Sequence, residues 1–246
     1  MTNPPALDTY AALVSTFSSF LTVAIHTILY ERSIYPTDTF LSARKYNFPV
    51  RQNRHPKVCK WINDAVNAVE AELMKGSVAR VAVVIYAPST QPLERFMFDV
   101  SNFPSVPTSE ALTPFEAPSE SGDSPAPPVG ANIVDLEEQF RGAMGRLAYC
   151  GSSLGSLPEG CSFTVCIELK DEGEAPIGHP QPWIPSQPTL QPRSQEDQSS
   201  RAGKAVGGAK TTPVRAVESG QFVLELWVEE AKAKEEISSR SSSTGA

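Results

Sequence analysis

The chain has 246 residues, of which 40% are apolar, so it can bury one sizeable core. Its 22 prolines and serine-rich C-terminal end indicate that some of the chain stays outside that core. The net charge of −7 argues against a broad phosphate-binding surface, which needs clustered lysines and arginines, so we expect any link to nucleic acid to run through a partner protein.

Two helices are predicted in the first third of the chain. Residues 8–30 carry apolar side chains on two faces, a pattern typical of a helix buried in the middle of a domain. The apolar run within it, from Phe20 to Tyr30, is shorter than the ~20 residues of a membrane span and lacks signal-peptide features, so no membrane contact is expected. The stretch "HPKVCKWINDAVNAVEAELMKG" predicts the second helix, with Pro56 in its first turn and Gly76 as its stop.

Strands and one more helix follow. The stretches "ARVAVVIYA" and "LERFMFDV" predict two antiparallel strands joined by "PSTQP". A helix is expected at about residues 133–149, and the strands "CSFTVCIEL" and "FVLELWVEE" are expected after it. Proline-rich, irregular stretches lie before the helix, at 103–128, and between these two strands. The order helix, helix, two strands, helix, strand, irregular segment, strand predicts an α+β domain with three helices on a mostly antiparallel sheet.

Signals for catalysis and for metal binding are weak. No nucleotide-binding, metalloprotease or nucleophile-elbow motif appears, and no cofactor is expected. The four cysteines form no CxxC pair, which argues against a zinc site or a disulfide framework and fits a reducing compartment. A dyad of Cys59 with His55, one helical turn apart, leaves a small Cys/His hydrolase as the rival from another functional class.

Two further features each admit two interpretations. The basic stretch "SARKYNFPVRQNRHPK" is either a surface that attracts an acidic partner or a solvated connection between helices. Trp61 lies beside the Val58 and Ile62 stripe, and by itself this position favours a core or half-core side chain. Trp183, in "HPQPWIPSQP", follows no periodicity and needs something to pack on.

Eight separated segments carry a resemblance to a known family. They are "LTVAIHTILYERSIYP", "KYNFPV", "HPKVCKWINDAV", "RVAVVIYA", "LERFMFDV", "GCSFTV", "PWI" and "LELWVEE", in this order and over about three quarters of the chain. Together they closely resemble the HORMA-domain accessory subunits of DNA polymerase zeta, the mitotic-arrest-deficient-like 2B family, and we expect a fungal member. The resemblance implies a HORMA fold whose C-terminal part, the safety belt, locks an extended partner peptide against the sheet.

The resemblance also implies roles for particular residues. Trp61 and Trp183, with Ile184 and Pro185, match the peptide-binding positions, although the family has a leucine where Pro185 stands, which puts the ligand preference in doubt. Val214, Glu225 and Trp227 match the surface that docks the deoxycytidyl transferase scaffold of translesion synthesis. The neighbouring Phe222, Leu224 and Leu226 point inward, so the alternation itself places Glu225 and Trp227 outward; for Trp227 the alternative is that it covers a neighbouring insert. Arg141 resembles an arginine used for pairing HORMA domains, as homo- or heterodimer, and its alternative is a plain surface arginine.

These expectations combine into one domain organisation and one function. A single HORMA domain spans 7–230, with a core of 7–103 and 131–171 and a belt of 172–230; disordered segments are expected at 104–130 and 236–246 and a flexible insert at 187–212. The predicted function is a nuclear, non-catalytic adaptor that captures a Pro-containing peptide of the polymerase zeta catalytic subunit and bridges to the translesion scaffold. The alternative within the fold is a spindle-checkpoint or meiotic HORMA adaptor with another closure motif.

Overall fold

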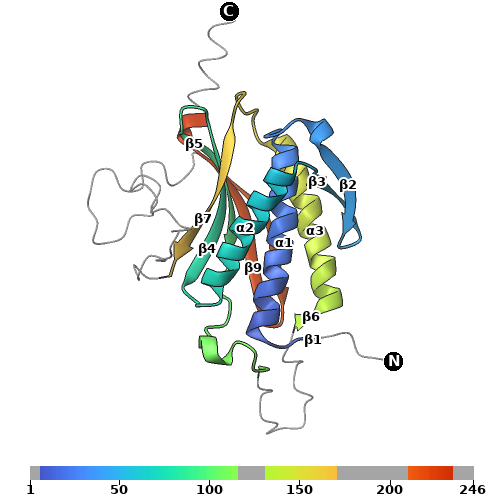
Figure 1. The fold of residues 1–246 in the computed structure, drawn as a ribbon, viewed down its shortest axis with the longest axis vertical. Coiled ribbons are helices and arrows are strands. Elements are labelled where there is room, and N and C mark those ends of the chain that lie inside the picture. The colour runs from blue at the N-terminus through green and yellow to red at the C-terminus, as the bar shows by residue number, and fades with distance from the viewer. Residues whose placement is uncertain (1–5, 116–130, 171–209, 235–246) are drawn as a thin grey trace, which may run out of the picture.

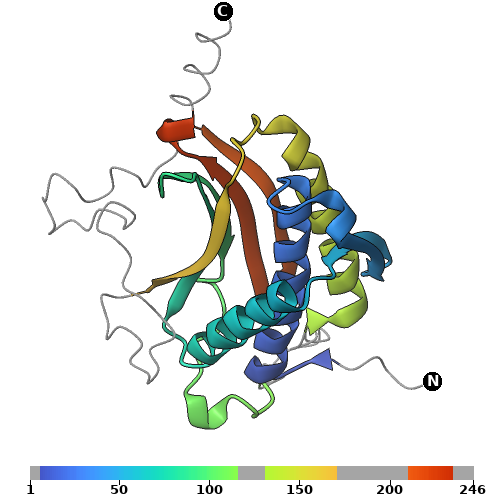
Figure 2. The same cartoon turned by 45° about the horizontal axis from the view of Figure 1, so that its top comes forward.

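Three α-helices lie side by side on one face of a five-stranded antiparallel sheet in the computed structural model, which describes residues 6–115, 131–170 and 210–234 (Figures 1 and 2). The helices are α1 (Tyr10–Glu31), α2 (Pro56–Leu73) and α3 (Ile133–Ser153). The sheet order is β7 (Ser162–Leu169), β4 (Val78–Tyr86), β5 (Pro92–Asp99), β9 (Phe222–Glu230) and β8 (Lys210–Ser219). The predicted α+β fold, with three helices on a mostly antiparallel sheet, is confirmed.

Helix α1 occupies the centre of the helical layer, between α2 and α3 (Figure 1). The hydroxyl of Thr9 caps its start by accepting a hydrogen bond from the Ala12 N–H at 3.2 Å. The helix is long and apolar enough to span a membrane, with mean hydropathy 1.7, but 67% of that window is buried in this fold. Its two apolar faces are therefore explained by packing on both sides, as predicted for a central helix.

The core lies between the helices and the inner face of the sheet. Phe140 of α3 stacks on Phe20 of α1 with ring centroids 4.4 Å apart and also meets Phe222 of β9 edge-on at 5.4 Å. Alternate residues of β5 and β9 point inward, as the period of two predicted. These inward residues are Phe96, Phe98, Phe222, Leu224, Leu226 and Val228.

A hairpin that the sequence analysis missed stands beside α1 and α3. It consists of β2 (Phe40–Lys45) and β3 (Phe48–Asn53), joined by Tyr46 and Asn47, both with φ of 53°. The left-handed conformation of this two-residue turn matches the twist of paired strands. The hairpin was missed because its turn lacks the usual glycine and because a proline such as Pro49 normally argues against a strand. The predicted basic stretch 42–57 is thus largely a hairpin and not a plain connection between helices.

The predicted disordered segment 104–130 is wrong in its first part. Residues 104–115 run past the start of α1, with a short 3-10 helix η2 (Thr108–Glu110) and a buried Ala111. The Ala111 carbonyl accepts a hydrogen bond from the Ala11 N–H, and the Phe115 N–H donates to the Asp8 carbonyl. These main-chain bonds order a segment whose composition has no periodicity; residues 116–130 lie outside the described part of the chain. A two-residue pair, β1 (Ala6–Leu7) with β6 (Ala131–Asn132), and a 3-10 helix η1 (Thr37–Thr39) complete the elements.

The C-terminal strands form the second edge of the sheet. Strand β9 pairs with β5 and carries β8 on its outer side. Strand β8 was not predicted, because its exposed, polar sequence and Pro213 at a register shift are typical of an edge strand. The predicted flexible insert 187–212 therefore ends too late, since residues 210–212 belong to β8. Residues 172–209 of the predicted belt and the predicted tail 236–246 lie outside the described residues.

Candidate functional site

A groove of about 360 Å³ opens between the start of α2 and the start of β7. Trp61 of α2 forms one wall and Phe163 of β7 another, with ring centroids 4.8 Å apart in an edge-on arrangement. Tyr35, which follows α1, meets Phe163 edge-on at 6.3 Å. The groove therefore presents three aromatic rings, and its remaining lining residues are Ile34, His55, Lys57, Val58, Cys161 and Ser162.

Trp61 is more exposed than the helix pattern suggested. Its relative exposure is 41%, whereas the next residue, Ile62, is completely buried. Of the core and half-core positions that the helix pattern favoured, the core one is wrong, because the helix turns Trp61 past the buried stripe and toward β7. An exposed tryptophan held against a second ring is typical of a binding surface.

The start of α2 is fixed by short-range bonds, which position Trp61. His55 caps the helix through its Nδ1, which accepts from the Lys57 N–H at 3.2 Å, and Pro56 occupies the first turn. The Cys59 thiol donates to the Asn53 carbonyl at 2.9 Å. His55 and Cys59 are thus both engaged with the backbone and not with each other, contrary to the hydrolase hypothesis. Burial also raises the pKa of the Cys161 thiol in the same groove, which keeps it protonated.

The groove lies beside a free edge of the sheet. Strand β7 pairs with β4 on one side, and among the described residues no strand pairs with its other side. An edge strand leaves a row of main-chain donors and acceptors open to another extended chain. The aromatic groove and the open edge together can hold an extended peptide by main-chain bonds and by its side chains.

A second hollow, of about 530 Å³, lies where β8 and β9 meet α3. Glu225 is exposed there, whereas Trp227 is half-buried on the outer sheet face against Ala82, Val84 and Met97. The Arg80 guanidinium lies 6.0 Å from the Trp227 ring centroid, and the Trp227 Nε1 donates to Glu229 at 2.8 Å. The indole is therefore held in one orientation and keeps part of its surface free.

The other predicted site residues differ in their exposure, and some of them lie outside the described part of the chain. Val214 lines the second hollow but is only 6% exposed and belongs to the main core, so its role in docking stays a prediction. Arg141 lies half-exposed on α3 and pairs with Glu138 one turn earlier, and its role in pairing HORMA domains stays a prediction. Trp183, Ile184 and Pro185 lie outside the described residues. Sequence reasoning missed Phe163 and Tyr35, and only the "SIYP" and "GCSFTV" segments hinted at them.

Comparison with known proteins places this fold in a family. The HORMA domain model matches residues 14–212. The DNA polymerase zeta processivity subunit of Schizosaccharomyces pombe is 33% identical over 216 residues, covering 88% of this chain and 92% of that protein. The mitotic spindle assembly checkpoint protein MAD2B of Danio rerio is 29% identical over 221 residues, covering 87% and 89%.

Solved structures agree on the fold. The structure of C. elegans HTP-2 bound to the HIM-3 closure motif matches with a TM-score of 0.60 at 11% identity, covering 93% of this chain and 94% of that one. HORMA proteins and the polymerase zeta processivity subunit are adaptors without catalytic activity, so the Cys/His hydrolase is excluded. This chain belongs to the HORMA-domain family.

Proposed function

We propose that this chain captures a short, proline-containing peptide of the catalytic subunit of DNA polymerase zeta against the free edge of β7. The observation that carries the proposal is the exposed Trp61 in an aromatic groove directly beside that edge. An added strand gains main-chain hydrogen bonds, which give affinity for any extended sequence. The aromatic walls select side chains, and flat proline and aliphatic groups pack well on Trp61 and Phe163.

The two points where the chain leaves the described core and enters it again support capture by a belt. The chain leaves the described core after β7 at one sheet edge and returns with β8 at the opposite edge. Five strands place these edges about 19 Å apart. The 39 residues from 171 to 209 can reach over 100 Å when extended. This length suffices to pass round a bound peptide, and we propose that Trp183, Ile184 and Pro185, within it, contact that peptide.

We propose a second partner at the second hollow. Glu225 and Trp227 offer a carboxylate and an oriented indole beside Arg146, which fits the docking of the translesion scaffold transferase. With these two partners the chain would work in the nucleus. Fluorescence imaging of the tagged protein tests this location.

Arg141 on α3 is the proposed contact for a HORMA homo- or heterodimer.

Relatives that carry the name of a spindle checkpoint protein favour a second candidate function. The MAD2B protein of Danio rerio covers almost as much of this chain as the polymerase subunit does. A checkpoint or meiotic adaptor would use the same groove and belt with a different closure motif. The two functions thus differ in the peptide and not in the site.

A competition experiment separates the two functions. The purified protein is titrated with a fluorescent peptide from the host's polymerase zeta catalytic subunit, and unlabelled checkpoint and meiotic closure peptides compete for it. Tight binding with slow release of the polymerase peptide, displaced only weakly by the others, supports the proposal, since affinity in such complexes resides mainly in slow dissociation. Preferred binding of a checkpoint or meiotic peptide would move the function to that candidate.

A further inference from the structure

The polar groups that line the aromatic groove include hydrogen-bond donors but no carboxylate. Beside its rings and aliphatic side chains, the lining consists of His55, Lys57, Cys161 and Ser162. The chain as a whole carries 28 acidic residues against 21 lysines and arginines, so a groove lined by a lysine and by no acid differs from the average of the molecule. A lysine side chain only donates hydrogen bonds, and it carries a positive charge. The groove is therefore suited to a ligand group that is negative and accepts hydrogen bonds.

Lys57 has no counter-charge within the described part of the chain. It is exposed in the first turn of α2, and that turn contains no acidic residue. The next lysine of the helix, Lys60, is paired with Asp64 at 2.7 Å. The start of a helix is the positive end of its dipole, where acidic groups are stabilising and a lysine is not. A negative ligand group at this position would balance a charge that the described fold leaves uncompensated.

His55 presents a donor beside Lys57. Its Nδ1 accepts the hydrogen bond from the Lys57 main-chain N–H at 3.2 Å that caps α2, so the neutral ring carries its proton on Nε2. The ring lines the groove, and among the described residues no acceptor binds this Nε2–H. A carboxylate that reaches Lys57 can therefore accept a second hydrogen bond from His55.

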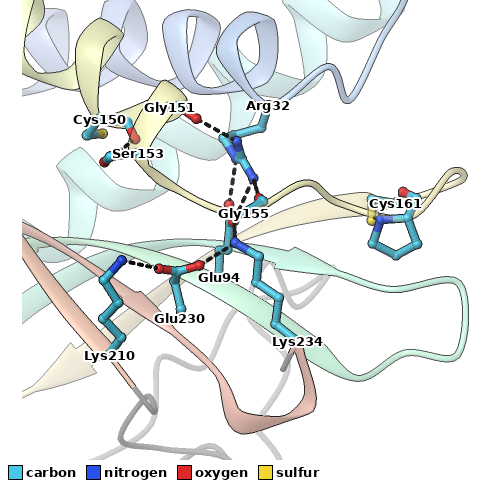
Figure 3. A network of polar contacts seen from close by, with 11 residues as sticks. Arg32, Glu94, Cys150, Gly151, Ser153, Gly155, Cys161, Lys210, Glu230 and Lys234 are labelled. Atoms are coloured by element: carbon cyan, nitrogen blue, oxygen red, sulfur yellow. Dashed lines mark hydrogen bonds and ion pairs between the residues drawn. The ribbon is translucent and has the colours of Figure 1, made fainter. Parts of the chain in front are cut away.

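The charged groups behind the groove cancel one another (Figure 3). Burial raises the pKa of the Cys161 thiol most, Glu94 raises it further and Arg32 lowers it, so both charges lie near the groove. Arg32 binds Glu94 with two parallel hydrogen bonds of 2.8 and 2.7 Å. Lys234 also donates to Glu94, and to Glu230 at 2.5 Å. Figure 3 shows these two cations and two carboxylates pointing toward one another, with Cys161 outside them. Carboxylates that are neutralised in this way do not offset the positive charge at the start of α2.

The β7 side of the groove is held in place without a ligand. Arg32 donates to the carbonyls of Gly151, in the last turn of α3, and Gly155, in the connection to β7, at 3.0 and 2.7 Å. At the other end of this connection, the Cys161 thiol donates to the Pro158 carbonyl at 3.2 Å. A wall that is already ordered adds little ordering cost to binding, so the chemistry of the ligand decides which peptides are preferred.

The spacing along α2 determines where on the peptide the negative group lies. Lys57 precedes Trp61 by four residues, so the two side chains are neighbours on one face of the helix, with Cβ atoms ~6 Å apart. An extended peptide advances ~3.3 Å per residue. A peptide residue one or two places from the one that packs on Trp61 therefore reaches Lys57.

We propose that the groove selects peptides that carry an aspartate or glutamate one or two residues from the proline packed on Trp61, with Lys57 as the specificity-determining residue. This inference rests on the proposed function, because it describes the peptide that is captured there. The ion pair is open to water, so it discriminates among peptides and does not supply most of the affinity. We expect an acidic residue to bind about fivefold more tightly than its amide, the upper end for an exposed ion pair, because His55 adds a hydrogen bond.

The test measures the Kd of paired peptides by fluorescence titration. Glutamate or glutamine is placed, one position at a time, at the two residues on each side of the proline in the polymerase zeta peptide. Each pair is titrated against the wild type, Lys57→Gln and Lys60→Gln. Lys57→Gln leaves the helix cap intact, since the cap uses the main-chain N–H. Lys60→Gln is the matched control, because it makes the same change of net charge on the same helix and Lys60 does not line the groove.

At one of these positions at least, we expect the wild type and Lys60→Gln to prefer glutamate about fivefold and Lys57→Gln to show no preference. The preference of the wild type should disappear in 1 M salt, where the Debye length is ~3 Å. Equal binding of glutamate and glutamine at every position by the wild type, or a preference that Lys57→Gln retains, would overturn the inference while capture of the peptide stands.

The same titrations separate this inference from the proposed function. If the wild type binds none of the polymerase peptides, their proposed capture fails, and the glutamate and glutamine pairs are made in the checkpoint and meiotic closure peptides. A glutamate preference that depends on Lys57 would then support the inference for that class of partner. Absence of binding by every peptide would overturn both.

Discussion

Truncation of Trp61 to alanine is the sharpest perturbation of the proposed groove, and its effect can be worked from the exposure of the ring. A tryptophan offers roughly 250 Å² of surface, and because Trp61 is 41% exposed, a bound peptide can cover about 100 Å² of it. At about 25 cal/mol per Å² this contributes about 2.5 kcal/mol to binding, so Kd should rise about 70-fold. The free energy of unfolding should fall by only about 1 kcal/mol, the value of one aromatic edge contact.

The assay is a fluorescence titration of the polymerase peptide, with urea denaturation of the same samples. Tyr149→Ala is the matched control, since Tyr149 is an aromatic residue that is 75% exposed on α3 and lines neither hollow. We expect the control to bind as the wild type does. A Kd for Trp61→Ala within about twofold of the wild type, or an equal loss in Tyr149→Ala, would refute the assignment of the groove.

Three more predictions address the second surface, the pH dependence and the core. Trp227→Ala should weaken binding of the translesion scaffold at least about tenfold in calorimetry and leave the peptide Kd unchanged; equal losses of both would show that the surfaces are not separate. Burial lowers the pKa of His26 to about 4, below its unfolded value of about 6.5. The unfolded state therefore binds the proton first, and the free energy of unfolding should fall by up to about 3 kcal/mol as pH drops from about 6.5 to 4. The urea midpoint plotted against pH should be flatter in His26→Gln than in the wild type. Phe140→Ala, which empties a completely buried stacked position, should cost about 3–5 kcal/mol in urea denaturation, and a loss below about 1 kcal/mol would contradict the packing described.

Periodicity predicted the buried elements well, because a helix or strand that faces the core has to repeat its apolar residues. Helix α1, strand β5 and strand β9 all follow such a pattern, and the inward positions of Phe222, Leu224 and Leu226 on β9 were predicted correctly. The hairpin β2–β3 and strand β8 were missed for the opposite reason. The hairpin forms a two-stranded sheet of its own and β8 is an edge strand. Both carry polar residues and a proline, and both are ordered by pairing with neighbours that no local pattern reveals.

The site was predictable only in part. The resemblance to relatives pointed to Trp61, whereas its helix position alone favoured the core. Whether a residue at the rim of a buried stripe is covered depends on what packs beside it, and here Phe163 of β7 leaves the indole open. The same applies to Val214, which a register shift next to Pro213 turns into the core. Tertiary contacts, which a single sequence does not contain, decided both positions.

Hydrogen exchange of β7 with and without the bound polymerase peptide tests the central claim most directly. If the peptide adds a strand at the free edge, backbone amides of β7 (Ser162–Leu169) that face outward become protected, in alternation with those already bonded to β4. Protection should reach its maximum when the fluorescence titration saturates. A saturated complex in which the exchange of β7 is unchanged, with protection elsewhere on the protein, would contradict capture at this edge.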